Sequence, residues 1–105
     1  EYAILTDEIT KAWAGKSVKE YKQFKNLKKQ NLRDNMTNLE LVLNMLAEAS
    51  TTEISKKKTP KNLSENKKVA QEGGNVAKQA RLTLEQQTGE SVISPRNIKM
   101  VQKRN

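Results

Sequence analysis

The chain has 105 residues and a formal net charge of +8, and it contains neither cysteine nor histidine. The lack of both residues excludes disulfides, thiolate zinc sites and the commonest catalytic base, so many enzyme mechanisms are excluded for this chain. Hydrophobic residues make up 34% of the chain and charged residues 30%, which suits a single domain with a small core. No apolar run approaches the ~20 residues that a bilayer-spanning helix needs, so we expect a soluble, cytoplasmic protein with no membrane partner.

Two short helices are predicted at the start of the chain. Thr6 has the position of an N-cap, because its hydroxyl can accept from free amides and the two acids after it favour the positive end of a helix dipole. Gly15 predicts the end of this helix, since glycine readily adopts the left-handed conformation of a helix C-terminus. Ser17 and Glu20 then form an S-x-x-E capping box. The expected outline is helix, glycine turn, helix.

The most hydrophobic stretch runs from 39 to 49, where eight of eleven residues are apolar. Glu40, Asn44 and Glu48 interrupt it and recur every four residues, which places them together on one narrow stripe of a helix. We interpret this stripe as the solvated side of a helix that is otherwise buried. The pattern therefore predicts a central hydrophobic helix over about 38–57, around which the other elements pack.

The ends of this central helix are marked by local signals. Residues 26 to 35 are rich in lysine and asparagine, so a loop or one weak helical turn should precede it. Thr37 and Glu40 form a second capping box at its start. Lys56–Lys58 suit the negative end of the helix dipole, and Pro60 forbids continuation.

A second long helix is predicted over about 65–88, with Ser64 as its N-cap and Gly89 as its left-handed end. Ser94 and Pro95 should open a last short helix that carries Ile98 and Val101. The chain has no alternating β-branched runs and no Asn-Gly or Asp-Gly hairpin signal. The predicted fold class is all-α, with four to five helices.

Two adjacent glycines interrupt the 65–88 helix near its middle, and each costs roughly 1 kcal/mol relative to alanine. We interpret them as part of a strip of small residues that lets the 39–49 helix approach closely. The residues of this strip are Gly73, Gly74, Ala77 and Ala80. The alternative is that the helix breaks here and restarts at Asn75, leaving free amides beside Lys78 and Arg81 as a possible anion site. No nucleotide-binding loop spacing supports that alternative.

Positive charge is concentrated in one segment, where seven basic residues accompany a single acid, Glu20. The basic residues are Lys16, Lys19, Lys22, Lys25, Lys28, Lys29 and Arg33. If the helix continued, Lys22, Lys25, Lys29 and Arg33 would line up on one side. Tyr21 and Phe24 lie beside them as possible stacking platforms. This concentration of positive charge predicts nucleic acid as the partner, with an affinity that falls steeply as salt rises. A merely solvated lysine-rich face, with both rings in the core, is the alternative.

Aspartate and glutamate are the only side chains that we consider as candidates for catalysis. Asp34, Glu40 and Glu48 form no metal-spaced or nucleophile-base constellation. We therefore predict no enzyme activity, no metal site and no cofactor.

Three stretches carry a family resemblance: "EYAILTDEITKAW", "LRDNMTNLELVLNMLAEASTTEIS" and "ENKKVAQEGGNVAKQARLTLEQQTGESVIS". They resemble the C-terminal region of BRO-family proteins and of DNA-damage-inducible protein D of bacteria and their phages. The resemblance is specific at "NMTNLELVLNMLAEASTTEI" and at the Gly-Gly-x-Val-Ala-x-x-Ala-Arg pattern of 73–81, and weaker after Pro95.

The resemblance implies a setting in phage regulation or the DNA-damage (SOS) response, and it supplies no catalytic residues. It also implies that an N-terminal BRO domain precedes this helical part, which agrees with a sequence that begins with Glu1. From it and the charge pattern, the expected function is a non-catalytic, DNA-associated regulatory module. The alternative is an interaction or dimerisation module without DNA contact, whose partner is a DNA-repair protein, a phage regulatory protein or a second copy.

Overall fold

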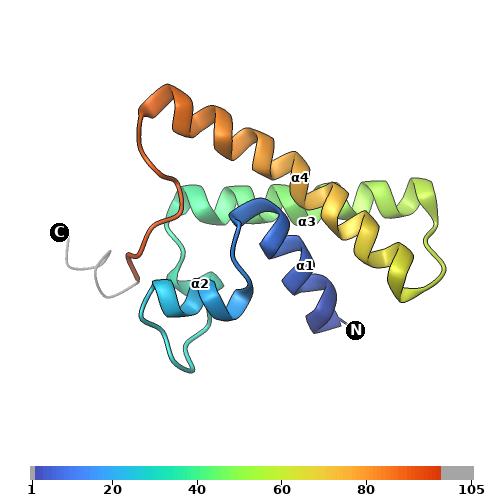
Figure 1. Ribbon diagram of the computed structural model, residues 1–105, viewed down its shortest axis with the longest axis horizontal. Helices are drawn as coiled ribbons and strands as arrows, with labels where there is room; N and C mark the ends of the chain where they lie inside the picture. Colours follow the sequence, from blue (N-terminus) through green and yellow to red (C-terminus); the bar gives the residue numbers. More distant parts are fainter. Residues whose placement is uncertain (1, 98–105) are drawn as a thin grey trace.

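Two long helices, α3 (Asn38–Lys58) and α4 (Leu63–Thr88), cross where Gly73 meets Thr51 and diverge toward the end of α4 (Figure 1). The computed structural model describes residues 2–97. Helix α1 (Tyr2–Ala14) packs against both long helices, and α2 (Val18–Phe24) follows it across a short turn. A 3-10 turn, η1 (Arg33–Asn35), precedes α3. The predicted all-α class with its two long helices is confirmed, and the described chain contains no strand.

Most helix boundaries follow the local signals in the sequence. The Ser17 hydroxyl accepts from the amide of Glu20 at 3.0 Å, while the Glu20 carboxylate accepts from the Ser17 amide at 2.8 Å. The predicted capping box of Thr37 is also present. Gly15 and Gly89 both have φ of 74°, a left-handed conformation that only glycine adopts without strain. These features confirm the predicted ends of α1 and α4 and the starts of α2 and α3.

Two predicted N-caps are wrong. Helix α1 already begins at Tyr2, so Thr6 lies inside the helix. Helix α4 begins one residue after Asn62, whose side-chain oxygen accepts from the amide of Glu65 at 2.8 Å. The predicted cap, Ser64, is therefore within the first turn.

The segment after α4 returns to the core instead of forming a helix. Val92 and Ile93 are buried, and the residues from Ser94 to Asn97 have no helical structure, contrary to the prediction. The backbone groups here bond to the core: the Ser94 amide donates to Glu40, and the carbonyl of Arg96 accepts from Lys25. These bonds take the place of a helical ladder. Ile98 and Val101, which we expected on this last helix, lie outside the described residues.

The core is built around two aromatic side chains, Trp13 and Tyr21, both 0% exposed. Their rings meet edge to face with centroids 6.2 Å apart. Leu43, Ala47 and Ala77 from the two long helices pack on the same cluster. A small core of this kind needs few large side chains because helices α1, α3 and α4 approach one another closely.

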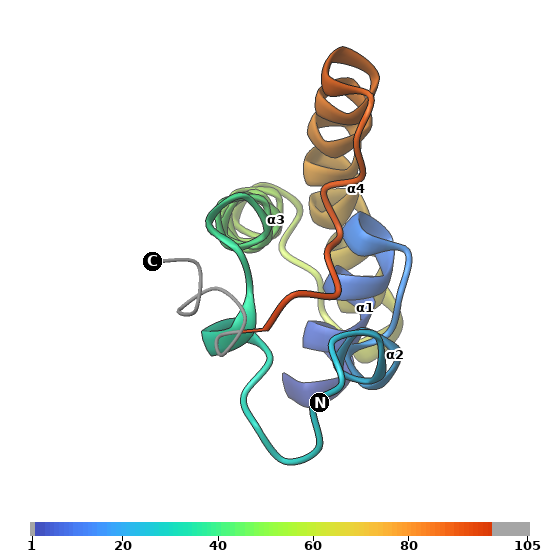
Figure 2. The ribbon, with the colours of Figure 1, turned by 90° about the vertical axis from the view of Figure 1, so that its left-hand side faces the viewer.

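Helix α3 is turned the opposite way from the prediction. Two of the three residues expected in solvent point inward, since Glu40 is 0% exposed and Asn44 is 7% exposed, whereas Glu48 stays at the surface. The Asn44 side-chain oxygen accepts from the Trp13 indole at 3.1 Å, so the stripe supplies the acceptors that the buried aromatic residues need. The apolar side is left on the surface, because α1, α2 and α4 all lie on the other side of α3 (Figure 2).

The glycine pair lies where three helices meet, and α4 runs through it without a break. A Cβ added to Gly73 would be 2.6 Å from the Cα and backbone nitrogen of Thr51 in α3. A Cβ added to Gly74 would be 2.5 Å from the Cβ of Ala12 in α1. Each glycine therefore permits a different neighbour to approach. Ala77 extends the contact strip into the core at 0% exposure, and Ala80 packs at its edge.

Candidate nucleic-acid interface

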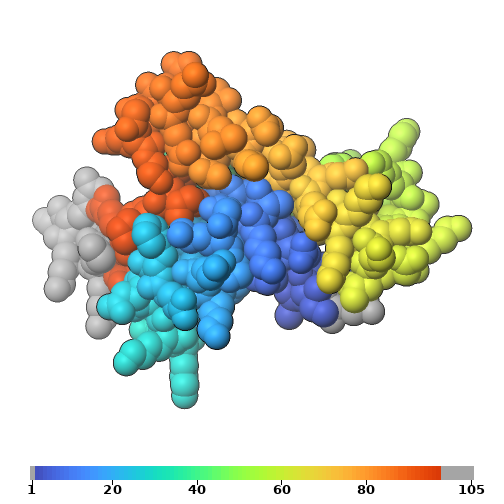
Figure 3. All heavy atoms as spheres, in the orientation of Figure 1, coloured from blue at the N-terminus to red at the C-terminus, as the bar shows by residue number. Residues whose placement is uncertain are grey.

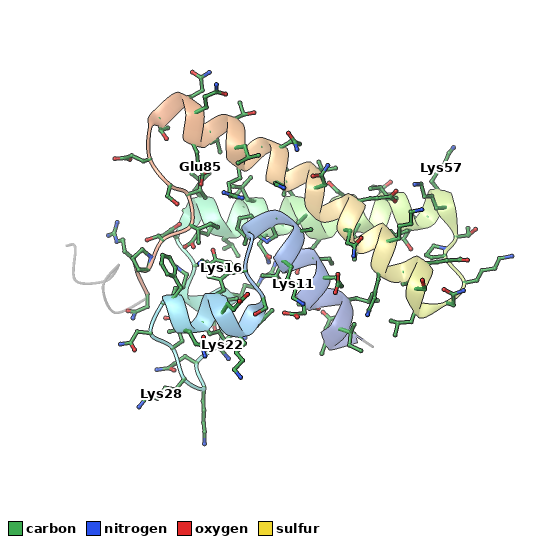
Figure 4. The ribbon with its side chains drawn as sticks, viewed as in Figure 1. Lys11, Lys16, Lys22, Lys28, Lys57 and Glu85 are labelled. Atoms are coloured by element: carbon green, nitrogen blue, oxygen red, sulfur yellow. The ribbon has the colours of Figure 1, made fainter. Side chains whose placement is uncertain are left out.

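Five of the seven predicted bases are at the surface of α2, the turn before it and the loop after it. Lys19, Lys28 and Lys29 are exposed, and Lys16 and Lys22 are half-buried. Figure 4 shows Lys22 and Lys28 pointing away from the body of the protein, and the loop after α2 protrudes in Figure 3. We call these five residues the α2 lysine group. The only acid in this stretch, Glu20, is engaged by Ser17, whose backbone and side-chain hydrogen bonds lower the pKa of its carboxyl.

Lys25 does not belong to this surface, and its prediction as a phosphate ligand is wrong. Its side chain is 0% exposed. The ammonium lies 2.7 Å from a Glu40 carboxylate oxygen and 2.7 Å from the carbonyl oxygen of Arg96. A fully enclosed ammonium with two such partners cannot reach a nucleic-acid phosphate.

The Glu40 carboxylate is the centre of a buried polar network. One oxygen accepts from Lys25 and, at 2.8 Å, from the Thr37 amide. The other accepts from the hydroxyl of Tyr21 and, at 3.1 Å, from the amide of Ser94. Burial, with the Glu40 carboxylate second, raises the pKa of Tyr21 well above its ordinary value. Four donors, from α2 and its C-cap, the N-cap of α3 and the segment after α4, thus converge on one carboxylate, which makes this network structural.

The predicted row of Lys22, Lys25, Lys29 and Arg33 does not form. Helix α2 ends at Phe24, so the chain beyond it does not keep the helical spacing that would align them. Arg33 sits on η1 with its guanidinium 3.0 Å from a Glu48 oxygen in a half-exposed ion pair. Its charge is therefore offset before any ligand arrives.

The two aromatic residues considered as stacking platforms differ in their exposure. Tyr21 is in the core, as expected from the alternative that places both rings there. Phe24 is 41% exposed, but the Lys16 ammonium lies over its ring, 4.5 Å from the centroid. The residue that sequence reasoning missed is Tyr2, which is 85% exposed. Its signal in the sequence is its place at the start of a short apolar run before Thr6.

Tyr2 borders a groove of about 750 Å³ between α1 and α2. Ile4, Val18 and Leu27 line it with apolar surface, and its charged lining consists of Asp7 together with Lys19 and Lys22 of the α2 lysine group. The groove thus places an exposed aromatic ring and apolar surface next to two ammonium groups. This combination matches unstacked bases with their phosphates.

The alternative interpretation, in which a helix break leaves an anion site beside Lys78 and Arg81, is contradicted. Because α4 is continuous, Asn75 caps no helix and leaves no amides free. Arg81 is engaged internally: its Nε donates to the Trp13 carbonyl at 2.8 Å, and its guanidinium pairs with Glu85 at 3.0 Å. Lys78 is exposed on the surface of α4 and does not share the Glu85 carboxylate with Arg81.

A second group of lysines lies at the other end of the molecule, where α3 turns into α4. Lys57, Lys61, Lys67 and Lys68 have no ion pair among the described residues, whereas Lys56 and Lys58 pair with Glu53 and Glu72. Figure 4 shows Lys57 pointing away at this end. The sequence analysis interprets Lys56–Lys58 as partners of the helix dipole alone. The signal for a wider group is that lysines recur on both sides of Pro60.

The carboxylates singled out in the sequence are dispersed. Glu40 is in the core and Glu48 pairs with Arg33, while Asp34 is exposed on η1. From residue 2 to residue 97, no group of three or more acidic side chains is arranged to hold a metal ion.

Comparison with protein-family models, curated proteins and solved structures finds no match for the chain. Within the described part of the chain, none of the helices has the length and apolar character needed to cross a bilayer.

Proposed function

We propose that this domain is a non-catalytic, nucleic-acid-binding module of a cytoplasmic regulatory or damage-response protein. The observation that carries the proposal is the α2 lysine group beside the groove between α1 and α2. The resemblance to the C-terminal region of BRO-family and DNA-damage-inducible D proteins supports the DNA-associated setting. It also supports a longer protein in which a BRO domain shares the DNA contact.

The geometry favours a single strand over a duplex. Phosphates of either form can pair with the exposed ammonium groups of Lys19 and Lys22. Only unpaired bases can enter the apolar groove and stack on the exposed ring of Tyr2. We therefore expect an unstructured oligonucleotide to bind more tightly than a duplex of the same charge.

The test is a titration of labelled oligo-dT and of a matched duplex at about 50 mM and about 200 mM salt. The variant Lys19→Gln/Lys22→Gln/Lys28→Gln should weaken binding and lower the salt slope by about 0.9 per lost phosphate contact for the duplex and about 0.7 for the single strand. The matched control, Lys57→Gln/Lys61→Gln/Lys68→Gln, removes the same charge at the opposite end and should change binding less.

Tyr2→Ala provides a second readout, because it removes stacking and leaves the charge unchanged. It should weaken oligo-dT binding by about 1–3 kcal/mol and leave duplex binding nearly unaffected. Absence of binding at low salt would refute the proposal. Equal losses from the two lysine triplets would show that binding follows net charge alone, and the assignment to α2 would then be wrong.

A further inference from the structure

A second hollow continues the groove between α1 and α2 on the other side of Tyr2. It has a volume of about 570 Å³ and lies between the start of α1, the second half of α3 and the first turn of α4. Tyr2 and Thr6, one helical turn apart on the same side of α1, line both the groove and the hollow. In Figure 1 the amino-terminal end of α1 lies between α2 and the start of α4. The two hollows therefore form one continuous concave surface that passes the exposed ring of Tyr2.

We propose that a single nucleic-acid strand bound in the groove between α1 and α2 continues over Tyr2 into this hollow and reaches Lys56 and Lys67. The inference rests on the proposed function, which provides the strand and its contacts with the α2 lysine group. Continuity with that groove and the return of positive charge at the far end select the same strand as the occupant. An exposed aromatic ring between two basic ends matches a strand whose bases stack on the ring while its phosphates contact lysines on either side.

Lys56 is the phosphate ligand that α3 contributes at the far end. It lines the hollow, and its side chain is 70% exposed. Its ammonium lies 3.4 Å from a carboxylate oxygen of Glu53, which is itself largely exposed. An ion pair in water contributes little, so a phosphate can replace it at small cost.

Lys67 is the ligand that α4 contributes, and it lies on the side of α4 that faces α1. Gln71, one turn later on the same side, donates to the Glu8 carboxylate at 3.0 Å. Because Gly74 meets Ala12 further along, α1 and α4 run in the same direction here. One turn before Gln71, Lys67 is therefore level with the start of α1, which lines the hollow.

The lining between these ends suits bases better than phosphates. The hydroxyl of Thr52 donates to the Glu48 carbonyl at 3.1 Å, so only its lone pairs are left for a ligand. Lone pairs accept from the N–H groups of a base edge and repel the oxygens of a phosphate. Besides Lys56, the charged groups of the lining are Arg33 and Glu48, which neutralise each other in an ion pair. The bases should therefore enter the hollow while the phosphates face the lysines.

Titration of labelled oligo-dT of about 6 and about 16 nucleotides tests the length of the site, within the range that single-strand sites span. The short strand fills the first groove, and the long strand also enters the hollow. The affinity of the long strand should therefore depend more steeply on salt, by about 0.7 in slope for each additional phosphate contact. The slope is the readout because a longer strand gains affinity merely from having more positions at which to bind.

Lys56→Gln/Lys67→Gln removes the proposed contacts at the far end. It should weaken binding of the long strand by at least about fivefold and lower its salt slope. Binding of the short strand should be nearly unchanged, because that strand does not reach the hollow.

The matched control is Lys57→Gln/Lys68→Gln, which removes the same charge from the same end of the molecule. By helical spacing Lys57 lies about opposite Glu48 around α3, and Lys68 lies about opposite Asn66 around α4. Glu48 and Asn66 both line the hollow, so the two control lysines face away from it. The control should weaken the long strand much less.

A second pair of variants tests the hollow itself. Thr52→Glu adds a carboxylate to its lining and should weaken the long strand alone. Thr83→Glu adds the same charge at an exposed position of α4 and should have little effect. Circular dichroism verifies that all four variants remain folded, as expected for surface positions.

Equal salt slopes for the two strands, or equal losses from the two lysine pairs, would overturn the extended path while leaving the first groove in place. If neither strand binds at low salt, the proposed function fails together with this inference, so the two failures are distinguishable. Poly-glutamate of the same charge as the long strand has no bases and should compete poorly. Equal competition by poly-glutamate would show that an acidic peptide fits the surface as well, and the assignment to nucleic acid would be wrong.

Discussion

Substituting Gly73 by alanine asks whether the crossing of α3 and α4 requires a residue without a side chain. The new Cβ would lie 2.6 Å from the Cα and from the backbone nitrogen of Thr51. Carbon atoms pack favourably at about 3.5–4.0 Å, so the two helices must separate by roughly 1 Å at this point. The Thr51 hydroxyl also obstructs the new Cβ and could rotate away, but the Cα and nitrogen of Thr51 belong to the backbone, so side-chain rotation alone does not relieve the clash.

The size of the effect follows from two opposing terms. Overpacking costs about 1–3 kcal/mol, and a clash with backbone atoms belongs at the upper end of that range. Alanine regains about 1 kcal/mol in helix propensity. The free energy of unfolding should therefore fall by about 2 kcal/mol. For a domain of this size each kcal/mol corresponds to about 4–8 °C, so the Tm should drop by roughly 10 °C.

The assay is thermal and urea unfolding followed by circular dichroism at the helical minimum. Asn75→Ala is the matched control, because Asn75 is exposed on the same helix and its replacement changes propensity without a clash. It should raise the Tm slightly. Gly73→Leu should not reach the native arrangement at all. If Gly73→Ala melts at or above the wild-type Tm, the close approach of the helices does not depend on glycine and the reasoning is refuted.

Two further predictions concern the buried network. Lys25→Met leaves the Glu40 carboxylate enclosed without its cation and should lower the free energy of unfolding in urea by about 3–5 kcal/mol. The double variant with Glu40→Gln should lose less than the sum of the two single losses. Strict additivity would contradict the coupling between the two side chains. Because burial raises the pKa of Tyr21, the folded state keeps a phenol proton that the unfolded chain releases above about pH 10. This contribution to stability is complete below that pH and is lost as the pH rises further. The unfolding free energy should therefore fall more steeply with pH in alkali for the wild type than for Tyr21→Phe. Identical slopes of unfolding free energy against pH would contradict the raised pKa of Tyr21.

Helix boundaries were predictable where a few neighbouring residues determine them. The capping boxes at Ser17 and Thr37 each involve four consecutive residues, and the left-handed conformation of Gly89 depends on that residue alone. Thr6 has equally good local chemistry as a cap, yet it lies inside α1 because apolar residues before it already form a helical turn. A cap signal therefore indicates a possible helix start, and the conformation of the preceding residues decides whether it is used.

The surface bases could not be sorted by sequence alone. Lys22, Lys25 and Lys28 have similar neighbours in the chain, and all three fit the same basic segment. What separates Lys25 is distant: Glu40, fifteen residues later, and the carbonyl of Arg96, seventy-one residues later. Burial of a lysine depends on whether the tertiary fold brings a carboxylate to its ammonium group. That information is absent from any local count of charge.

The inversion of α3 has a physical reason that applies to any nearly all-apolar helix with one polar stripe. Periodicity places Glu40 and Asn44 on a common face but does not say which side of the helix is buried. The decision comes from elsewhere in the chain, because the buried indole of Trp13 and hydroxyl of Tyr21 each need an acceptor. The stripe on α3 supplies both acceptors and is drawn inward. The apolar side, with Val42 and Met45, is left outside as a consequence.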